Sequence, residues 1–400
     1  MRSSRKYVLL AGLYVAQTLP GHFFSNVFPV VLREHGASLA SIGYLQVIGL
    51  PWLLKFLWAP LVDRLVGPRG LHARVIVALE ALFCLSTLAL AFVDFRAHFA
   101  LVVGLMTLSY AFAATQDVAV DALAIRLLSQ RERGPGNAVQ TGGNIVGALL
   151  GTAGGLALYQ LIGWSGVLIA LALALLPPLL PLAGLGRRAA GAVGPPSRHG
   201  GMLGFFGQPG AKRWSLIMLA SHGGSMASMM MSKPLLVDLG FSAVGIGLLT
   251  GVYGLGLGLV GAWAGGRIIV GLGRKAALAL GCLLSAVAAA SLAPLALGLV
   301  SGPYLLTGLG LSGVGLGLTM TAVNTIAMDF ARSGHEGADY SLQVAISMLG
   351  GGVVMGASGV LAQALGYLGL FALCALLCLG AAGLAWFFFR ERRPAAATSG

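Results

Sequence analysis

The chain has 400 residues, of which 57% are hydrophobic and only 9% are charged. Soluble proteins carry about 25% charged residues, so this composition excludes a soluble monomer, a disordered chain and a secreted disulfide scaffold. The net charge of +13 does not indicate nucleic-acid binding, because the charges lie in short segments between apolar runs. The sequence therefore predicts an all-α polytopic membrane protein.

Twelve apolar segments are long enough to cross a bilayer, which requires about 20 residues in a helix. Their backbone polar groups must be paired within each helix, because lipid offers no hydrogen bonds. The first segment follows a basic start but is too long for a signal peptide. The predicted spans are residues 7–32, 40–62, 74–93, 98–121, 138–161, 165–185, 214–237, 244–266, 276–296, 303–328, 341–363 and 367–389.

The twelve segments form two halves that repeat. A shift of 203 residues places Gly134 on Gly337 and Gln140 on Gln343. Parallel six-helix repeats are typical of one large group of secondary transporters. We therefore predict an N-terminal six-helix bundle (1–185), a cytoplasmic linker (186–212) and a C-terminal six-helix bundle (213–400).

The distribution of basic residues predicts the orientation. If both termini face the cytoplasm, only Arg33 and Arg96 of the 25 lysines and arginines fall in outer loops. Lys55 and Lys233 lie within predicted helices, and the remaining basic residues lie on the cytoplasmic side. This asymmetry follows the positive-inside rule, so we expect both termini in the cytoplasm.

Three stretches carry a family resemblance. KFLWAPLVDR (55–64) ends the second predicted helix, and ATQDVAVDALAIRLL (114–128), closing with RERGPGNAVQ, covers the fourth. Together they resemble the muropeptide-permease (AmpG-like) branch of the major facilitator superfamily. The segment MSKPLLVDLGFS (231–242) resembles siderophore importers of the RhtX/FptX type. The resemblance implies the major facilitator fold, the bacterial inner (plasma) membrane, a monomer and no cofactor.

The superfamily's loop motif, glycine-x-x-x-aspartate-arginine, is imperfect in this chain. Asp63 and Arg64 are present, but Ala59 stands where the glycine is usual, and Gly266 replaces the aspartate in the second half. We therefore expect the gating charges to lie mainly in the first half. The gating residues implied by the resemblance are Asp63, Arg64 and Arg126.

Ionisable side chains within the spans are costly and are candidate functional residues. At 1.5 Å per residue, Lys55 lies about 12 Å and Asp117 about 13.5 Å inside the cytoplasmic helix ends. Because they share a depth, we predict a buried ion pair. Asp121 lies on the same helix face as Asp117. Two interpretations stay open: these groups carry protons during transport, or they only hold helices together, with Asp121 pairing with a loop residue such as Arg131.

Other polar residues are expected in the cavity of the major facilitator fold. His22 and His222 lie on corresponding helices of the two halves, next to helix-loosening residues, so a substrate role and simple packing are both open. Lys233 either extends to the outer interface or attracts an anionic ligand. Asn324 and Gln343 complete the candidate set. We predict no metal site, because no third ligand lies at helical spacing from either histidine.

The predicted function is proton-driven import of a ferric siderophore by alternating access; the substrate class follows from the resemblance alone. A muropeptide permease and a small-molecule efflux pump are the alternatives. An intramembrane enzyme is disfavoured, because the sequence lacks H-E-x-x-H, Gly-x-Gly-Asp and an intrahelical G-x-S-x-G. The expected partners are a small-molecule substrate, protons and the lipid bilayer. A receptor that does not transport would differ only in a flux measurement.

Overall fold

The computed structural model describes residues 3–67, 70–183 and 201–391, and within these ranges it is helical, without a strand. Most of the predicted linker (186–212) lies outside the described residues. Short 3-10 or π-helical turns connect many of the helices. The α-helices are α1 (Ser3–His22), α2 (Phe28–Glu34), α3 (Leu39–Tyr44), α4 (Leu50–Leu54), α5 (Ala59–Val66), α6 (His72–Leu90), α7 (Phe99–Leu127), α8 (Arg133–Leu149), α9 (Gly155–Ala174), α10 (Leu179–Ala183), α11 (Ala211–Ser221), α12 (Gly223–Asp238), α13 (Ala243–Ile246), α14 (Leu255–Leu292), α15 (Gly302–Phe330) and α16 (Glu336–Phe388).

Within the described residues, six helical stretches are long and apolar enough to cross a membrane, and a pair of helices bent by 58° adds one more. Three of the six contain 50, 54 and 53 residues, about twice the length that a bilayer requires. Each of these three reverses at a glycine with positive φ, namely Gly163, Gly273 and Gly366. Glycine suits these positions because it adopts positive φ without strain. Each long stretch therefore contains two of the predicted spans.

Of the six remaining predicted spans, three are continuous, as α6, α7 and α15, and three are interrupted near their middle. The first runs from α1 through a π-helical turn at Phe23–Val27 into α2. The seventh predicted span, residues 214–237, breaks at His222, between α11 and α12. Irregular turns also lie at Leu45–Gly49 and Gly247–Gly254, which a shift of 204 residues places on one another. Such interruptions are common at functional sites.

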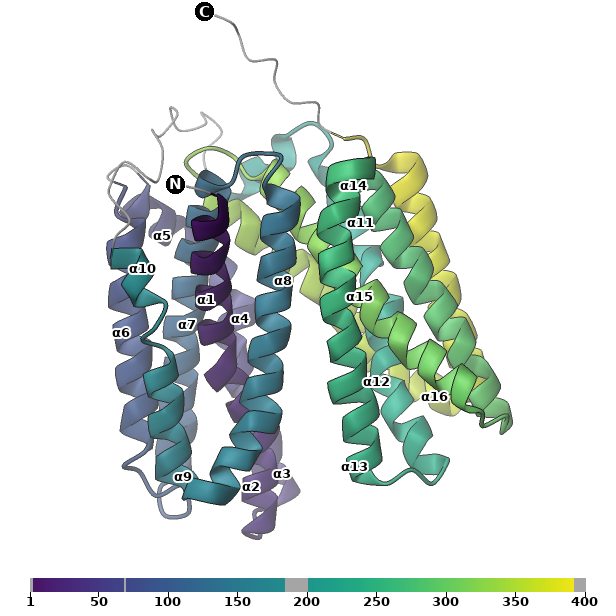
Figure 1. The fold of residues 1–400 in the computed structure, drawn as a ribbon, viewed down its shortest axis with the longest axis horizontal. Helices are drawn as coiled ribbons and strands as arrows, with labels where there is room; N and C mark the ends of the chain where they lie inside the picture. Colours follow the sequence, from purple (N-terminus) through teal and green to yellow (C-terminus); the bar gives the residue numbers. More distant parts are fainter. Residues whose placement is uncertain (1–2, 68–69, 184–200, 392–400) are drawn as a thin grey trace, which may run out of the picture. The chain divides into compact units, whose positions relative to one another are not determined.

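The chain forms two compact units, each built from one half of the sequence together with a short segment of the other half. The first unit comprises Met1–Leu127, Gly143–Met202 and Ala331–Leu342; the second comprises Leu128–Gly142, Leu203–Phe330 and Gln343–Gly400. Within the first unit, α6 packs along α7, and within the second, α14 packs along α15 (Figure 1). Both exchanged segments contain charged residues that form ion pairs, Glu336 in the first unit and Arg133 in the second.

Glycines allow α14 and α15 to approach closely. A Cβ atom added at Gly317 would collide with the backbone oxygen of Gly258, and one added at Gly261 would collide with the backbone of Val314. Small residues at such contacts are how helices associate in lipid. The high glycine content of this chain, 61 residues, thus has a packing role in the second unit.

We predict that Gly317→Ala destabilises the protein by about 1–3 kcal/mol, the usual range for overpacking. The added methyl group would meet backbone atoms of α14, which cannot rotate away. Gly256→Ala is the matched control, because open space surrounds that position. Thermal unfolding of the detergent-solubilised protein measures both, and equal effects of the two substitutions would contradict this account of the helix contact.

Candidate functional site

A buried ion pair lies inside the first unit. The ammonium group of Lys55 contacts the carboxylate of Asp117 on α7, and the two side chains are only 3% and 6% exposed. Lys55 belongs to a short 3-10 turn, Lys55–Leu57, at the bend between α4 and α5. Its ammonium also lies 4.8 Å from the centre of the Trp52 ring. The ion pair predicted from the common depth of the two residues is confirmed.

Helix α1 supplies further partners for the carboxylates on α7. Gln17 donates a hydrogen bond of 2.6 Å to Asp117, and the Tyr14 hydroxyl donates one of 2.8 Å to Asp121. Spacings of three and four residues bring Tyr14, Gln17 and Thr18 to one face of α1, and Thr18 bonds Asn144 at 3.0 Å. The suggested partner of Asp121, Arg131, is exposed, whereas Asp121 is buried against Tyr14.

Glu80 on α6 is a further buried carboxyl group, and it was not among the candidates chosen from the sequence. Gln116 donates a hydrogen bond of 2.6 Å to Glu80, and Glu80 is fully buried. One oxygen of each side chain, Oε1 in both, has no hydrogen-bond partner. A proton on Glu80 would supply a donor for the amide oxygen. The rule that singled out Lys55 and Asp117 applies equally to Glu80, a lone acid in an apolar run, so the signal was available.

Asp63 caps the start of the longest helix. Its carboxylate accepts hydrogen bonds from the backbone N–H groups of Gly337, at 2.9 Å, and Ala338, at 2.7 Å, in the first turn of α16. These N–H groups have no partner within the helix, and an anion there also interacts favourably with the helix dipole. All three residues lie in the first unit. Asp63 thus holds the exchanged segment Ala331–Leu342.

The same segment is held by an ion pair. Arg126 at the end of α7 donates two hydrogen bonds of 3.2 Å to the carboxylate oxygens of Glu336. Such a bidentate pair combines charge with a fixed geometry. The third predicted gating residue, Arg64, is exposed and has no ion-pair partner among the described residues. Asp63 and Arg126 therefore both bind the segment Ala331–Leu342, and Arg64 takes no part in these contacts.

The second unit contains an ion pair at the equivalent place, with its charges reversed. Asp329 pairs with Arg133 at 2.7 Å and with Arg274 at 2.6 Å. The shift of 203 residues carries Arg126 to Asp329 and Arg133 to Glu336. The two ion pairs are therefore related by the repeat. Asp329 and its two arginines thus form a charged cluster of the second unit, while the expectation that the gating charges lie mainly in the first half stays a prediction.

The missing aspartate of the second copy is replaced by close backbone packing. Gly266, the counterpart of Asp63, lies against Gly134, the counterpart of Gly337: a Cβ atom added at Gly266 would be 3.3 Å from the Gly134 oxygen and 2.9 Å from the Ala138 methyl group. An aspartate side chain has no room there. The departure from the motif thus has a steric reason.

The remaining candidate residues lie in varied environments. His22 is half-buried, with Nδ1 3.3 Å from the side-chain nitrogen of Asn26. His222 is buried; its Nδ1 lies 3.0 Å from the Ser347 hydroxyl, and its Nε2 has no hydrogen-bond partner. Lys233 is exposed and Asn324 is half-buried.

Gln343 has a structural environment. It accepts a hydrogen bond of 2.8 Å from the Trp214 indole and donates one of 3.0 Å to the Ala327 carbonyl. Both partners are part of the packing of the second unit. Among the described residues, no group of three His, Cys, Asp or Glu side chains is arranged to hold a metal ion.

The sequence profile of the Major Facilitator Superfamily matches residues 10–352 and, in an overlapping match, residues 214–400. The anhydromuropeptide permease of Escherichia coli K12 is 28% identical over 281 residues, which cover 66% of this chain and 55% of that protein. An uncharacterised protein of Haemophilus influenzae is 28% identical over 295 residues, covering 69% and 67%. The chain thus matches little more than half the length of the Escherichia coli relative.

Solved structures share the fold. The human organic anion transporter MFSD10 (TETRAN) has a TM-score of 0.73 at 18% identity, with 96% of this chain and 100% of that one covered. A bacterial homologue of the iron transporter ferroportin has a TM-score of 0.67 at 16% identity, with 96% and 98% covered. At these identities the likeness concerns the fold alone, and it confirms the predicted all-α transporter architecture.

We predict that the Lys55–Asp117 pair behaves as one energetic unit. Lys55→Met alone leaves a buried charge without its partner and should cost about 3–5 kcal/mol. The double variant Lys55→Met/Asp117→Leu removes both charges and should recover most of that loss, because replacing a whole buried pair with apolar groups is often nearly neutral. Thermal unfolding of the single and double variants measures the coupling; additive losses would contradict a direct pair.

We also predict that the polarity of the Arg126–Glu336 pair can be exchanged. Arg126→Glu places two carboxylates together and should cost about 3 kcal/mol. Adding Glu336→Arg should restore stability, because the repeat-related pair already has this reversed order. The matched control is Arg64→Glu, a change at an exposed residue that should alter stability by less than about 0.5 kcal/mol. Failure of the double variant to regain thermal stability would show that the order of charges is fixed by other contacts.

Proposed function

The chain belongs to the Major Facilitator Superfamily, and from this premise we propose that it is a proton-coupled secondary transporter that imports a small organic solute across the bacterial inner membrane. The observation that carries the proposal is the buried pair of Lys55 and Asp117, with Gln17 on the second carboxylate oxygen. In a membrane span such a pair is expensive and is a functional candidate by default.

The proposed coupling step is protonation of Asp117. A proton on this carboxyl group would remove the negative charge that Lys55 contacts, and the ammonium would then need a new partner. The nearby carboxyl group of Asp121, bonded to Tyr14, lies one helical turn away on the same face. Transfer of Lys55 between two such groups would link proton binding to a rearrangement of α4 and α7. The purely structural interpretation predicts no such link.

The proposed gate is the set of contacts on Ala331–Leu342. Alternating access requires contacts that form in one state and break in another. The hydrogen bonds from Gly337 and Ala338 to Asp63, and the pair of Arg126 with Glu336, are suited to this because each joins the first half of the sequence to the second. We propose that the predicted six-helix halves, 1–185 and 213–400, move as units when these contacts break.

An anhydromuropeptide is the first candidate substrate, because relatives of 28% identity carry that name. A ferric siderophore is the second, favoured by the resemblance of residues 231–242 to siderophore importers. In that case any iron would arrive inside the ligand. Both classes of ligand often carry carboxylates, which the exposed Lys233 on α12 could attract.

Uptake in a bacterial host that lacks its own permeases for both ligands tests the function. Labelled anhydromuropeptide and radio-iron siderophore complexes are offered separately, with and without an uncoupler. Accumulation of either ligand that the uncoupler removes supports proton-driven import and identifies the substrate class. Ligand binding without flux would indicate a receptor, and outward movement of either ligand would indicate efflux; both outcomes contradict the proposal.

We predict that Asp117→Asn reduces accumulation to the level seen with the uncoupler while exchange of labelled for unlabelled substrate continues. The asparagine retains the shape and the hydrogen bond with Gln17 but cannot cycle a proton. Glu80→Gln is the matched control, since it makes the same chemical change in another buried carboxyl group of the first unit. Unchanged accumulation in Asp117→Asn would refute the coupling role and leave the pair as a structural element.

A further inference from the structure

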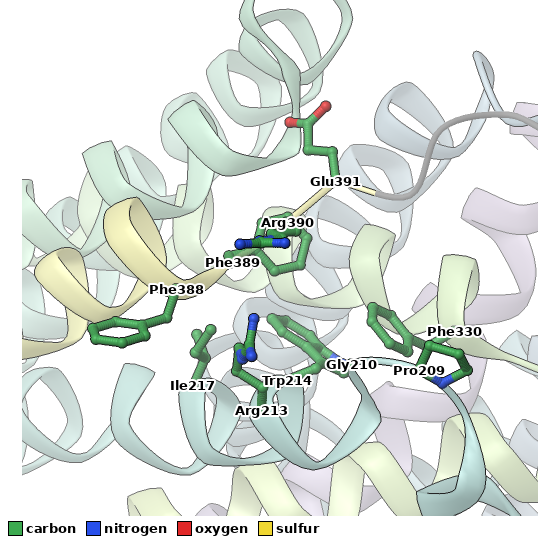
Figure 2. Close-up of a pocket in the computed structure, with 10 residues that line it drawn as sticks. All are labelled: Pro209, Gly210, Arg213, Trp214, Ile217, Phe330, Phe388, Phe389, Arg390 and Glu391. Carbon is green, nitrogen blue, oxygen red and sulfur yellow. The ribbon is translucent and has the colours of Figure 1, made fainter.

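A pocket of about 330 Å³ opens at one end of the second unit. It is formed by the start of α11, the last residue of α15 and the end of α16. Figure 2 shows its lining side chains. They are Pro209, Gly210, Arg213, Trp214, Ile217, Phe330, Phe388, Phe389, Arg390 and Glu391. None of them belongs to the ion pairs described above or to the buried group of Tyr14, Gln17, Lys55, Asp117 and Asp121.

Two arginines face this pocket without a counter-ion. The guanidinium groups of Arg213 and Arg390 extend toward the middle of the group of lining residues (Figure 2). Neither has a hydrogen bond or an ion pair among the described residues. The pocket's carboxylate, Glu391, points away (Figure 2) and accepts a hydrogen bond of 2.9 Å from the backbone N–H of Lys275. The carboxylate of Glu391 therefore does not neutralise the positive charge of the two arginines.

The start of α11 adds to this positive charge. Its first turn contains Lys212 and Arg213 and no acidic residue, and Gly210 before it provides no side-chain cap. The first N–H groups of a helix lack partners within the helix and form the positive end of its dipole. Basic residues there are unfavourable unless an anion lies nearby. An anion in the pocket would satisfy both arginines and this helix end.

The floor of the pocket is apolar and rigid. Trp214 is buried and stacks on Phe330, with ring centres 5.9 Å apart, while the Phe389 ring lies 5.6 Å away. The hydrogen bond from its indole N–H to Gln343 fixes the ring. Phe388 at the side of the pocket is 53% exposed, and Trp386 and Phe387 on the same turn are also exposed. Exposed aromatic rings at the end of a spanning helix are typical of the membrane interface.

We propose that this pocket binds the headgroup phosphate of an anionic phospholipid. The two guanidinium groups would hold the phosphate oxygens, which suit the planar fork of arginine. The aromatic rings would contact the glycerol and the first methylene groups of the acyl chains. Basic pockets between helices at the membrane surface are suited to anionic lipids. A soluble anion would use the arginines but would leave the exposed rings beside the pocket unoccupied, which is why we favour a lipid.

Thermal unfolding of the purified full-length protein in detergent tests the proposal. The additions are phosphatidylglycerol, phosphatidylcholine or inorganic phosphate, each over a range of concentrations. Phosphatidylglycerol should raise the Tm in a saturable manner, and the other two should not. In Arg213→Gln and Arg390→Gln, half-saturation should require about fivefold more lipid for each arginine removed, since one basic residue near a lipid surface contributes about that factor.

Arg267→Gln is the matched control. Arg267 is also exposed, and it lies over an aromatic ring, 5.2 Å from Trp263, on another helix of the same unit. Its removal should leave the lipid dependence unchanged. An equal loss in this variant would show a general charge effect and overturn the proposal. A Tm rise with inorganic phosphate alone would indicate a soluble anion instead of a lipid, and a rise with phosphatidylcholine would indicate unspecific solvation.

Native mass spectrometry of the wild-type protein gives a second measurement that does not depend on variants that fold poorly. The protein is extracted from a mixture of equal parts phosphatidylglycerol and phosphatidylcholine. One retained phosphatidylglycerol per chain is the expected result. Retention of both lipids in proportion to the mixture, or of neither, would contradict a specific pocket.

Discussion

The contact of Lys55 with Asp117 is the constraint on which the inside of the first unit depends. Two opposite charges in an apolar bundle are tolerated only when each satisfies the other and the remaining hydrogen-bonding positions are filled. Gln17 fills one of these positions on Asp117, and Trp52 covers the ammonium. The 3-10 turn that contains Lys55 lies where the helix axis changes direction by 58°, and Pro60, a residue type that commonly breaks helices, follows in the first turn of α5.

A network of this kind is well suited to control by a single proton. Removing one charge leaves the other buried and uncompensated, and the cost of that state is several kcal/mol, enough to shift a conformational equilibrium by orders of magnitude. Glu80 differs, because its hydrogen-bond partner is the neutral Gln116, and it forms no ion pair within the part of the chain that the structure describes. One helix, α7, thus presents a charge-dependent contact at Asp117 and an uncharged contact at the adjacent residue.

The sequence alone predicts the parts of the molecule that lipid constrains most directly. Apolar length gives the spans, and helix depth gives the pair of Lys55 and Asp117, because burial leaves few ionisable residues to choose from. The ends of the helices are not predicted as well. Helix α7 continues to Leu127, next to the pair of Arg126 with Glu336, and α16 begins at Glu336, where Asp63 caps its first turn. Those contacts are hundreds of positions apart in the chain, so no local pattern reveals them.

Comparison of the two repeats does point to these contacts, because residues at corresponding positions of the two halves have opposite charges. Arg126 and Arg133 lie in the first half, and their counterparts, Asp329 and Glu336, in the second. With identical copies, each half would hold one basic and one acidic residue seven positions apart and could pair within itself. Because one half has two arginines and the other two acids, each pair must join both halves of the sequence. The opposite charges of the two halves therefore favour the exchanged segments that both units contain. They also prevent ion pairs between these positions within one half, which would compete with the pairs that join the halves.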